Sequence, residues 1–231
     1  MKNTVFFIVF SICFLSSFAQ DSLVKDVDSL YKEDQFYAGV TYNLLGKKPH
    51  EVSQTGFSTG FYFGFIKDMP LNSRRNMAIG VGLGYATNSF NQNMLIYKDA
   101  SNKPVYTILT DVSGHYKRNK FSTHVVELPI EFRWRTSTAS DYDFWRIYTG
   151  FKLGYMFSHA AKYRGSLGDF KYRDIADFNN FQYGLTLSAG YSTWNFHFYY
   201  GLNTILNSHA SLNGSPIDMN ELKIGLMFYI L

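Results

Sequence analysis

The sequence predicts an all-β chain that closes into an eight-stranded antiparallel transmembrane β-barrel of a Gram-negative outer membrane. Three observations predict this fold: apolar and polar side chains alternate in eight segments, long and short connections alternate, and charged residues are only 17% of the chain against 19% aromatic residues. After residue 20 no continuous apolar stretch reaches the roughly 20 residues that a transmembrane helix needs. A membrane would therefore be crossed by alternating strands.

The first 20 residues have the layout of a cleaved secretory signal peptide. Lys2 precedes an apolar run from Val5 to Leu15, and small and polar residues follow up to Gln20. The only cysteine, Cys13, lies in this segment, so the predicted mature chain has no thiol for disulfides, metal sites or catalysis.

Residues 21–34 are expected to form a charged periplasmic leader, and residues 35–231 to form the barrel. The leader carries Leu23, Val27 and Leu30 at spacings of four and three. This spacing allows an amphipathic helix, and a solvated segment is the alternative.

The eight predicted strands share one pattern, in which every second residue is apolar and the residues between are small, polar or charged. The apolar face is expected to meet lipid and the other face to point into the barrel. Arg in place of Leu187 or Leu226 should therefore cost roughly 2 to 4 kcal/mol near the midplane, whereas Gly225→Ser should be mild. The predicted strands are 36–44, 56–65, 76–85, 126–135, 145–158, 181–191, 194–203 and 221–231.

The connections favour a membrane barrel over a soluble β-sandwich, which would also show alternation. Short turns and longer loops follow one another, as in barrels with periplasmic turns, extracellular loops and both termini in the periplasm. Pro129 lies inside the fourth strand and predicts a bulge or locally unpaired backbone. The connections are 45–55, 66–75, 87–120, 136–144, 159–180, 192–193 and 203–220.

Charged residues on the predicted inner face point to a filled interior. A barrel of eight strands is just wide enough for side chains to fill it, and buried charges persist mainly when they are paired. We expect an internal ion-pair network, with Lys152 opposite or diagonal to a glutamate; a proton or substrate pathway is the alternative. The network comprises Glu127, Glu131, Arg133, Arg135, Arg146, Lys152, Glu221 and Lys223.

No catalytic, cofactor-binding or metal-binding residue is predicted, and no small-molecule substrate is expected. The net charge of +4 is scattered and forms no basic block for nucleic acid. His124 and His197 are expected to be hydrogen-bonded wall residues. His115, His159 and His209 have serine neighbours, and so leave a lipid-modifying enzyme or protease with a site at the extracellular rim as an alternative; a surface binding or structural barrel is another.

Several strings resemble the PorT (SprT) family of the Bacteroidetes, and the resemblance covers nearly the whole mature chain. They occupy residues 33–37, 74–80, 131–138, 144–152 and 222–231. The resemblance implies a non-enzymatic outer-membrane component that assists type IX secretion, the export of surface and gliding-motility proteins. Its partners would be outer-membrane lipid and other secretion-system proteins. Arg74 and Arg75, in a predicted periplasmic turn, are candidate partner contacts.

Overall fold

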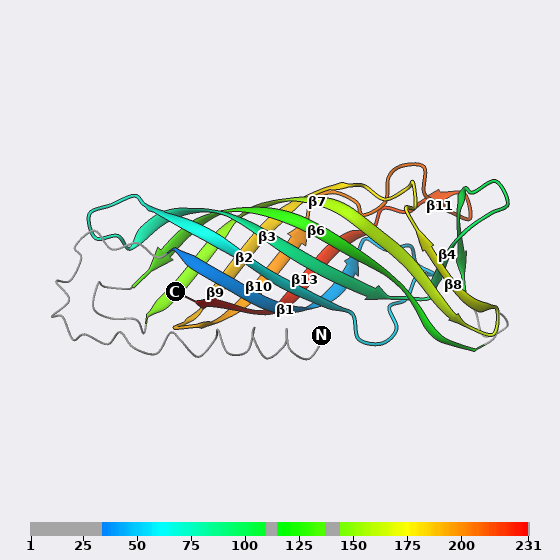
Figure 1. The fold of residues 1–231 in the computed structure, drawn as a ribbon, viewed down its shortest axis with the longest axis horizontal. Coiled ribbons are helices and arrows are strands. Elements are labelled where there is room, and N and C mark those ends of the chain that lie inside the picture. Colours follow the sequence, from blue (N-terminus) through cyan, green and yellow to red (C-terminus); the bar gives the residue numbers. More distant parts are fainter. Residues whose placement is uncertain (1–33, 110–114, 137–143, 231) are drawn as a thin grey trace, which may run out of the picture. The chain divides into compact units, whose positions relative to one another are not determined.

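The computed structural model describes residues 34–109, 115–136 and 144–230, and these residues form strands, turns and loops without a helix. The predicted signal peptide and nearly all of the leader lie outside the described residues. Within the described ranges no helix has the length and apolar character to cross a membrane. Eight long strands form the wall of a barrel (Figure 1). They are β1 (Gln35–Gly46), β2 (Thr59–Pro70), β3 (Met77–Asn91), β6 (Tyr116–Arg135), β7 (Trp145–Gly165), β9 (Phe181–Tyr191), β10 (Trp194–Gly201) and β13 (Asn220–Ile230).

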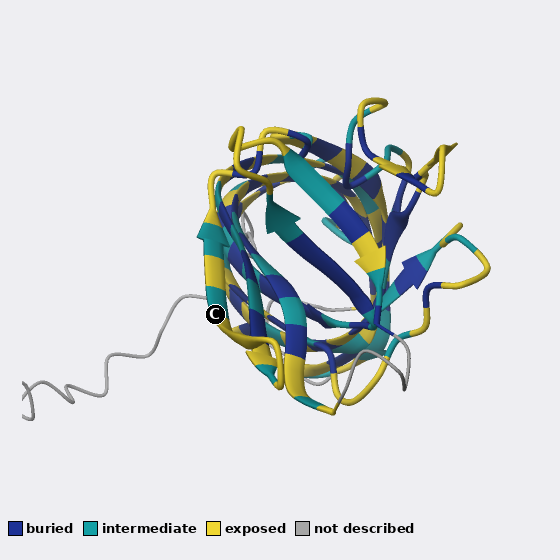
Figure 2. Ribbon diagram, turned by 90° about the vertical axis from the view of Figure 1, so that its right-hand side faces the viewer, coloured by how far each residue is buried: buried dark blue, intermediate teal, exposed yellow. Residues whose placement is uncertain are grey.

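The wall is antiparallel and closed, which confirms the predicted fold class. Its strand order is β6-β3-β2-β1-β13-β10-β9-β7, and a β6–β7 pairing joins the two ends of this order. β1 and β13 pair from Phe36↔Ile230 to Gly46↔Asn220, so the first and last strands lie side by side. Seen from the end that carries the long connections, the strands form a ring (Figure 2).

Within the described residues, five short strands lie at the end of the barrel that carries the long connections. The hairpin of β4 (Met94–Lys98) and β5 (Pro104–Ile108) follows β3, and β8 (Gly168–Arg173) pairs with the upper part of β7. β11 (Ser211–Leu212) pairs with β12 (Ser215–Pro216) between β10 and β13. The opposite end has the turns 71–76 and 192–193, the end of β6 at Arg135 and the start of β7 at Trp145, together with the start of β1 and the end of β13. It is therefore the end expected to face the periplasm.

At the end with the long connections, β3, β6 and β7 each extend at least six residues beyond their predicted bounds, because the alternation reverses its polarity there. In the predicted parts of β3, β6 and β7, apolar side chains point outward. Nearer the end with the long connections, the outward residues are polar, such as Lys120 and Lys162. There Phe121 and Tyr163 are buried inside the barrel. This is the pattern of a barrel wall in water with a packed core. Much of the predicted connections 87–120 and 159–180 is therefore strand.

Pro129 is accommodated by a gap in one ladder. β3 and β6 pair at Val81↔Ile130 and again at Gly84↔Glu127, with no pairs between. On the other side Pro129 remains in register with Lys152. The predicted unpaired backbone is confirmed, and a register shift of the β6–β7 ladder lies elsewhere, between His124 and Val125.

Gly225 lies where two strands approach closely, so the expectation of a mild Gly225→Ser change is wrong. A Cβ atom at this position would lie 2.0 Å from the carbonyl oxygen of Val40 and 2.6 Å from the Cα atom of Thr41. Both atoms belong to the backbone of β1 and cannot rotate away. Periodicity assigns Gly225 to a face of the strand but does not report this distance.

Candidate functional site: a filled barrel interior

The lower part of the interior, near the short turns, is held by a carboxylate shared between two arginines. Asp68 Oδ1 lies 3.0 Å from Arg133 Nη1, and Asp68 Oδ2 lies 2.8 Å from Arg135 Nη2. All three side chains are fully buried. Glu131 lies 3.5 Å from Arg133 Nε, and Gln35 accepts a hydrogen bond from the same guanidinium. These contacts tie β1, β2 and β6 together across the lumen.

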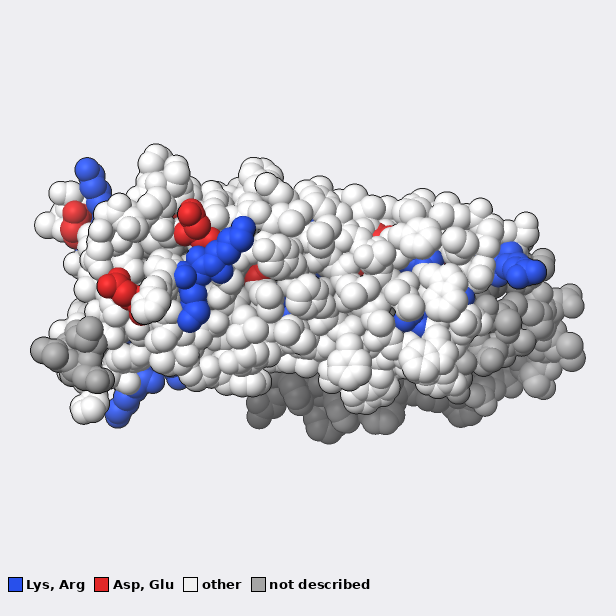
Figure 3. All heavy atoms as spheres, turned by 180° about the vertical axis from the view of Figure 1, so that it is seen from behind, with Lys and Arg blue, Asp and Glu red and all other residues white. Residues whose placement is uncertain are grey.

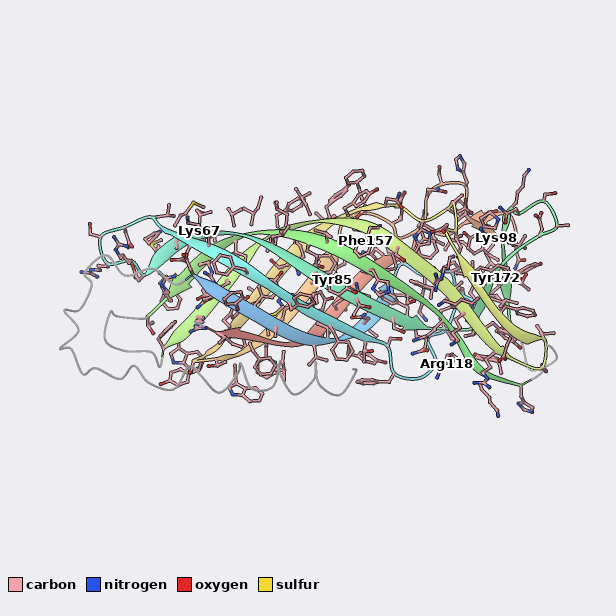
Figure 4. The ribbon with its side chains drawn as sticks, in the orientation of Figure 1. Lys67, Tyr85, Lys98, Arg118, Phe157 and Tyr172 are labelled. Carbon is pink, nitrogen blue, oxygen red and sulfur yellow. The ribbon has the colours of Figure 1, made fainter. Side chains whose placement is uncertain are left out.

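Asp68 was not among the predicted charges. The predicted second strand ends at residue 65, whereas β2 continues to Pro70 and keeps its alternation, so Asp68 is inside and Lys67 is outside. Lys67 breaks the apolar outer face, which hid the continuation of the strand. Figure 4 shows Lys67 toward the short-turn end, where a long cationic side chain can reach the lipid headgroups.

Two lysine–glutamate pairs occupy the middle of the interior. Lys152 Nζ lies 2.9 Å from Glu127 Oε2, and Lys223 Nζ lies 2.7 Å from Glu221 Oε2. Because Pro129 is opposite Lys152, Glu127 is diagonal to it on the same inner face. The ammonium groups of both lysines lie close to the rings of Tyr62 and Tyr199. Lys152 Nζ is 4.9 Å from the centroid of the Tyr62 ring. The corresponding distance from Lys223 to Tyr199 is 4.7 Å.

Arg146 is placed differently from the other seven predicted network residues. Its guanidinium lies over the Phe144 ring, 4.3 Å from the centroid. Among the described residues, its buried Nε and Nη1 atoms have no hydrogen-bond partner. Arg146 is therefore inside the barrel, as the pattern predicts, but belongs to no ion pair of the described residues.

The wall histidines are hydrogen-bonded as expected. His197 Nδ1 lies 2.7 Å from Ser188 Oγ inside the barrel, and the Tyr229 hydroxyl donates to the same serine at 3.3 Å. His124 Nδ1 lies 2.6 Å from the Tyr85 hydroxyl. Both histidines have local structural partners.

A hydrophobic core fills the end of the barrel with the long connections. Phe90 and Phe121 stack at 4.8 Å, and Phe178 meets Phe121 edge-on at 5.6 Å. Residues of the loops, such as Ile205 and Met219, complete this core and are fully buried. A packed core at the extracellular end and ion pairs below it occupy successive levels of the lumen.

The β4–β5 hairpin is joined to the loop after β8 by a buried hydrogen bond. The Tyr106 hydroxyl donates to Asp177 Oδ2 at 2.9 Å. Burial raises the pKa of Tyr106 well above its usual range, and the neighbouring Asp177 carboxylate adds to this shift. The hydroxyl therefore remains a donor at physiological pH.

The candidate rim histidines do not form a recognisable catalytic arrangement in the described residues. His159 is buried, stacks on Phe178 at 4.4 Å, and places Nε2 2.9 Å from the Ile175 amide nitrogen. His115 and His209 are exposed. Asp111 and Ser113, near His115 in sequence, lie outside the described residues. No group of His, Cys, Asp or Glu suited to a metal ion occurs in the described part of the chain.

The candidate partner contacts lie in the turn between β2 and β3. Arg74 is exposed and Arg75 is partly buried. Arg75 has a φ of 54° and donates its backbone N–H to the Asn72 carbonyl at 3.0 Å. The turn thus presents Arg74 at the end of the barrel expected to face the periplasm.

The outer face carries an apolar band between two aromatic levels. Along β7 the outward residues run from Trp145, 60% exposed, to Phe157, 53% exposed. Twelve residues at ~3.3 Å each and a tilt of ~40° span about 30 Å, close to the ~25 Å apolar band of such barrels. On the face in Figure 3, charged atoms gather toward the two ends and the middle is largely uncharged. Such a surface fits a hydrocarbon environment.

Comparison with known protein families agrees with this architecture. A family described as "Outer membrane protein beta-barrel domain" matches residues 18–207. None of the curated proteins compared with the chain matches it significantly. With a closed eight-stranded wall, an apolar outer band and a family match over most of its length, the chain belongs to the outer membrane protein β-barrel domain family and is an integral outer-membrane protein.

Proposed function

We propose that this protein is a non-enzymatic accessory or assembly component of type IX secretion and does not itself conduct the secreted chains. The observation that carries the proposal is the filled lumen: buried ion pairs cross its lower and middle levels, and an apolar core fills its extracellular end. Its resemblance to the PorT (SprT) family supplies the pathway.

If the barrel conducted secreted polypeptides, most of the contacts that fill its interior would have to break. A secreted polypeptide would have to displace Lys152 from Glu127 and Lys223 from Glu221. Separating buried charges without replacement partners costs several kcal/mol for each ion. A protein with such an interior acts more readily through its surfaces: the lipid-facing wall, the extracellular loops and the periplasmic turns.

The turn that carries Arg74 is a candidate surface for other secretion-system proteins. It is exposed at the expected periplasmic end, and an arginine can bind carboxylates with two hydrogen bonds. The proposed role does not need a catalytic residue, a metal or a cofactor.

Deletion of the gene in its host tests the proposal. We expect surface and secreted proteins with type IX signals to be lost, and the wild-type gene to restore them. Complementation with Arg74→Ala/Arg75→Ala should restore the barrel but not full export if the turn contacts a partner. A matched control changes Lys47 and Lys103, exposed at the other end. Normal export in the deletion strain would refute the proposed role.

A surface-binding barrel is the second candidate, and an apolar pocket at the extracellular end favours it. The pocket has a volume of about 340 Å³ between the β4–β5 hairpin and β8. Leu95, Tyr97, Ile108, Phe170 and Tyr172 are among its lining residues. Under this function, removal of the hairpin abolishes ligand binding while secretion continues.

A rim enzyme is the remaining alternative. It predicts that Ala at His115, His159 or His209 abolishes an activity on lipid or peptide while the barrel still folds. An unchanged activity in all three variants would count against it.

A further inference from the structure

A dense basic surface covers the outer wall where β6, β7 and β8 extend past the apolar band. The β6–β7 and β7–β8 registers align Lys120, Lys162 and Lys171 in one row across the three strands. Directly opposite residues of antiparallel strands point to the same face of a sheet. Arg118 and Arg164 form the next row, and Arg173 lies on the other side of the lysine row. These six residues are called the basic face below.

The opposite side of the same three strands establishes that the basic face points outward. Tyr163 is 2% exposed and packs with Phe170 against Leu95 and Leu109 on the inner side. Because side chains alternate along a strand, Lys162 and Lys171 must point away from this core. Arg118 lies toward the extracellular end, beyond Tyr85 and Phe157 (Figure 4).

The basic face is poorly neutralised. Among the described residues of β6, β7 and β8, one carboxylate, Asp169, lies on the same face as these six cations, 3.3 Å from Arg164 Nε. No other ion pair of the basic face occurs among the described residues. Lys120 donates to the Ser89 hydroxyl at 3.0 Å, which fixes its position without neutralising it. Aligned like charges repel, so this arrangement costs free energy unless an anion offsets it.

The position of the basic face relative to the apolar band indicates which kind of anion it would meet. His124, Tyr85 and Phe157 form an aromatic group at the upper end of the apolar band. Lys120 lies four residues before His124 in β6, nearer the end with the long connections. At ~3.3 Å per residue and a tilt of ~40°, this places it about 10 Å above the aromatic group. With the long connections outside the cell, this level corresponds to the headgroups of the outer leaflet, which border the apolar band. Phosphate oxygens there accept hydrogen bonds from Lys and Arg while the acyl chains lie along the apolar wall.

We propose that the outward side of β6, β7 and β8 is a binding site for the phosphate groups of a phosphorylated glycolipid of the outer leaflet. Lys120, Lys162 and Lys171 bind the phosphates, and Arg118, Arg164 and Arg173 border them. The apolar wall below holds the acyl chains. This site is independent of the proposed secretion role.

The test uses the folded mature protein in zwitterionic micelles and a lipid A probe with two phosphates, compared with the same lipid after removal of its phosphates. Binding is followed by the change in melting temperature and by a fluorescent lipid A titration. We expect phosphate removal to weaken binding at least about 10-fold. The variant Lys120→Gln/Lys162→Gln/Lys171→Gln should lose a similar factor, and added salt should weaken binding of the wild-type protein.

The matched control is Lys47→Gln/Lys98→Gln/Lys103→Gln, which removes the same charge at the same end but outside the basic face. It should bind within about twofold of wild type, because screening confines the attraction to nearby charges. Both variants are checked for folding by their mobility in unheated detergent gels. Equal binding of the two lipids, or unchanged binding by the first variant, would overturn the proposal. Displacement of lipid A by millimolar inorganic phosphate would also overturn it, since the face would then bind a free anion.

Discussion

Asp68→Asn should be among the most destabilising single substitutions that leave the size of a side chain unchanged. Asp68 lies within 3.0 Å of Arg133 and within 2.8 Å of Arg135, and all three side chains are fully buried. The amide keeps the shape but removes the negative charge that two buried guanidinium groups share. Removing one partner of a buried ion pair costs about 3 to 5 kcal/mol. We expect the free energy of unfolding to fall by that amount.

Asp169→Asn is the matched control for Asp68→Asn. Asp169 also pairs with an arginine, Arg164, but their side chains are 65% and 61% exposed. Exposed pairs contribute about 0 to 1 kcal/mol. Both variants can be unfolded by urea in phospholipid vesicles while tryptophan fluorescence is recorded. If Asp68→Asn unfolds within about 1 kcal/mol of wild type, or if the two variants lose equal stability, the reasoning about the buried carboxylate is wrong.

Three further substitutions probe other levels of the structure. Leu187→Arg, at a lipid-facing position that is 46% exposed, should cost about 2 to 4 kcal/mol in vesicles, and Leu187→Met should be nearly neutral. Gly225→Ser should cost about 1 to 3 kcal/mol, because its Cβ meets the backbone of Val40; wild-type resistance to unfolding in detergent gels would contradict this. Tyr106→Phe removes the hydrogen bond to Asp177 and should lower the local stability of the β4–β5 hairpin by about 1 kcal/mol. Protease cleavage within this hairpin should therefore become faster, and an unchanged cleavage rate would refute the prediction.

The transmembrane part of the fold was predictable because lipid outside and side chains inside impose a strict two-residue alternation. β9 has the bounds that periodicity predicts, and β13 differs by one residue at each end. The upper parts of β6 and β7 were not predicted, since water replaces lipid outside the wall and the apolar side chains turn inward. A search for the reversed alternation directly after each apolar segment would have found these extensions.

The inner charges were predictable as a set but not as a network. Alternation places Glu127 and Lys152 on the inner face, and the register then determines that they meet. Asp68 was missed because Lys67 interrupts the apolar outer face. Arg146 shows the opposite limitation: it points inward, but among the described residues it has no ion-pair partner. Pairing depends on side-chain reach across the lumen, which a pattern along one strand does not contain.

The seam between β1 and β13 has a consequence for how the protein is made. Its eleven residue pairs join the first and last strands of the barrel, so the sheet keeps two open edges until β13 has been synthesised. Open edges cannot persist in hydrocarbon, because their backbone groups lack hydrogen-bond partners. A chain that stops after β10 would therefore be lost as a whole to aggregation or proteolysis, and insertion into the membrane must wait for the final strand.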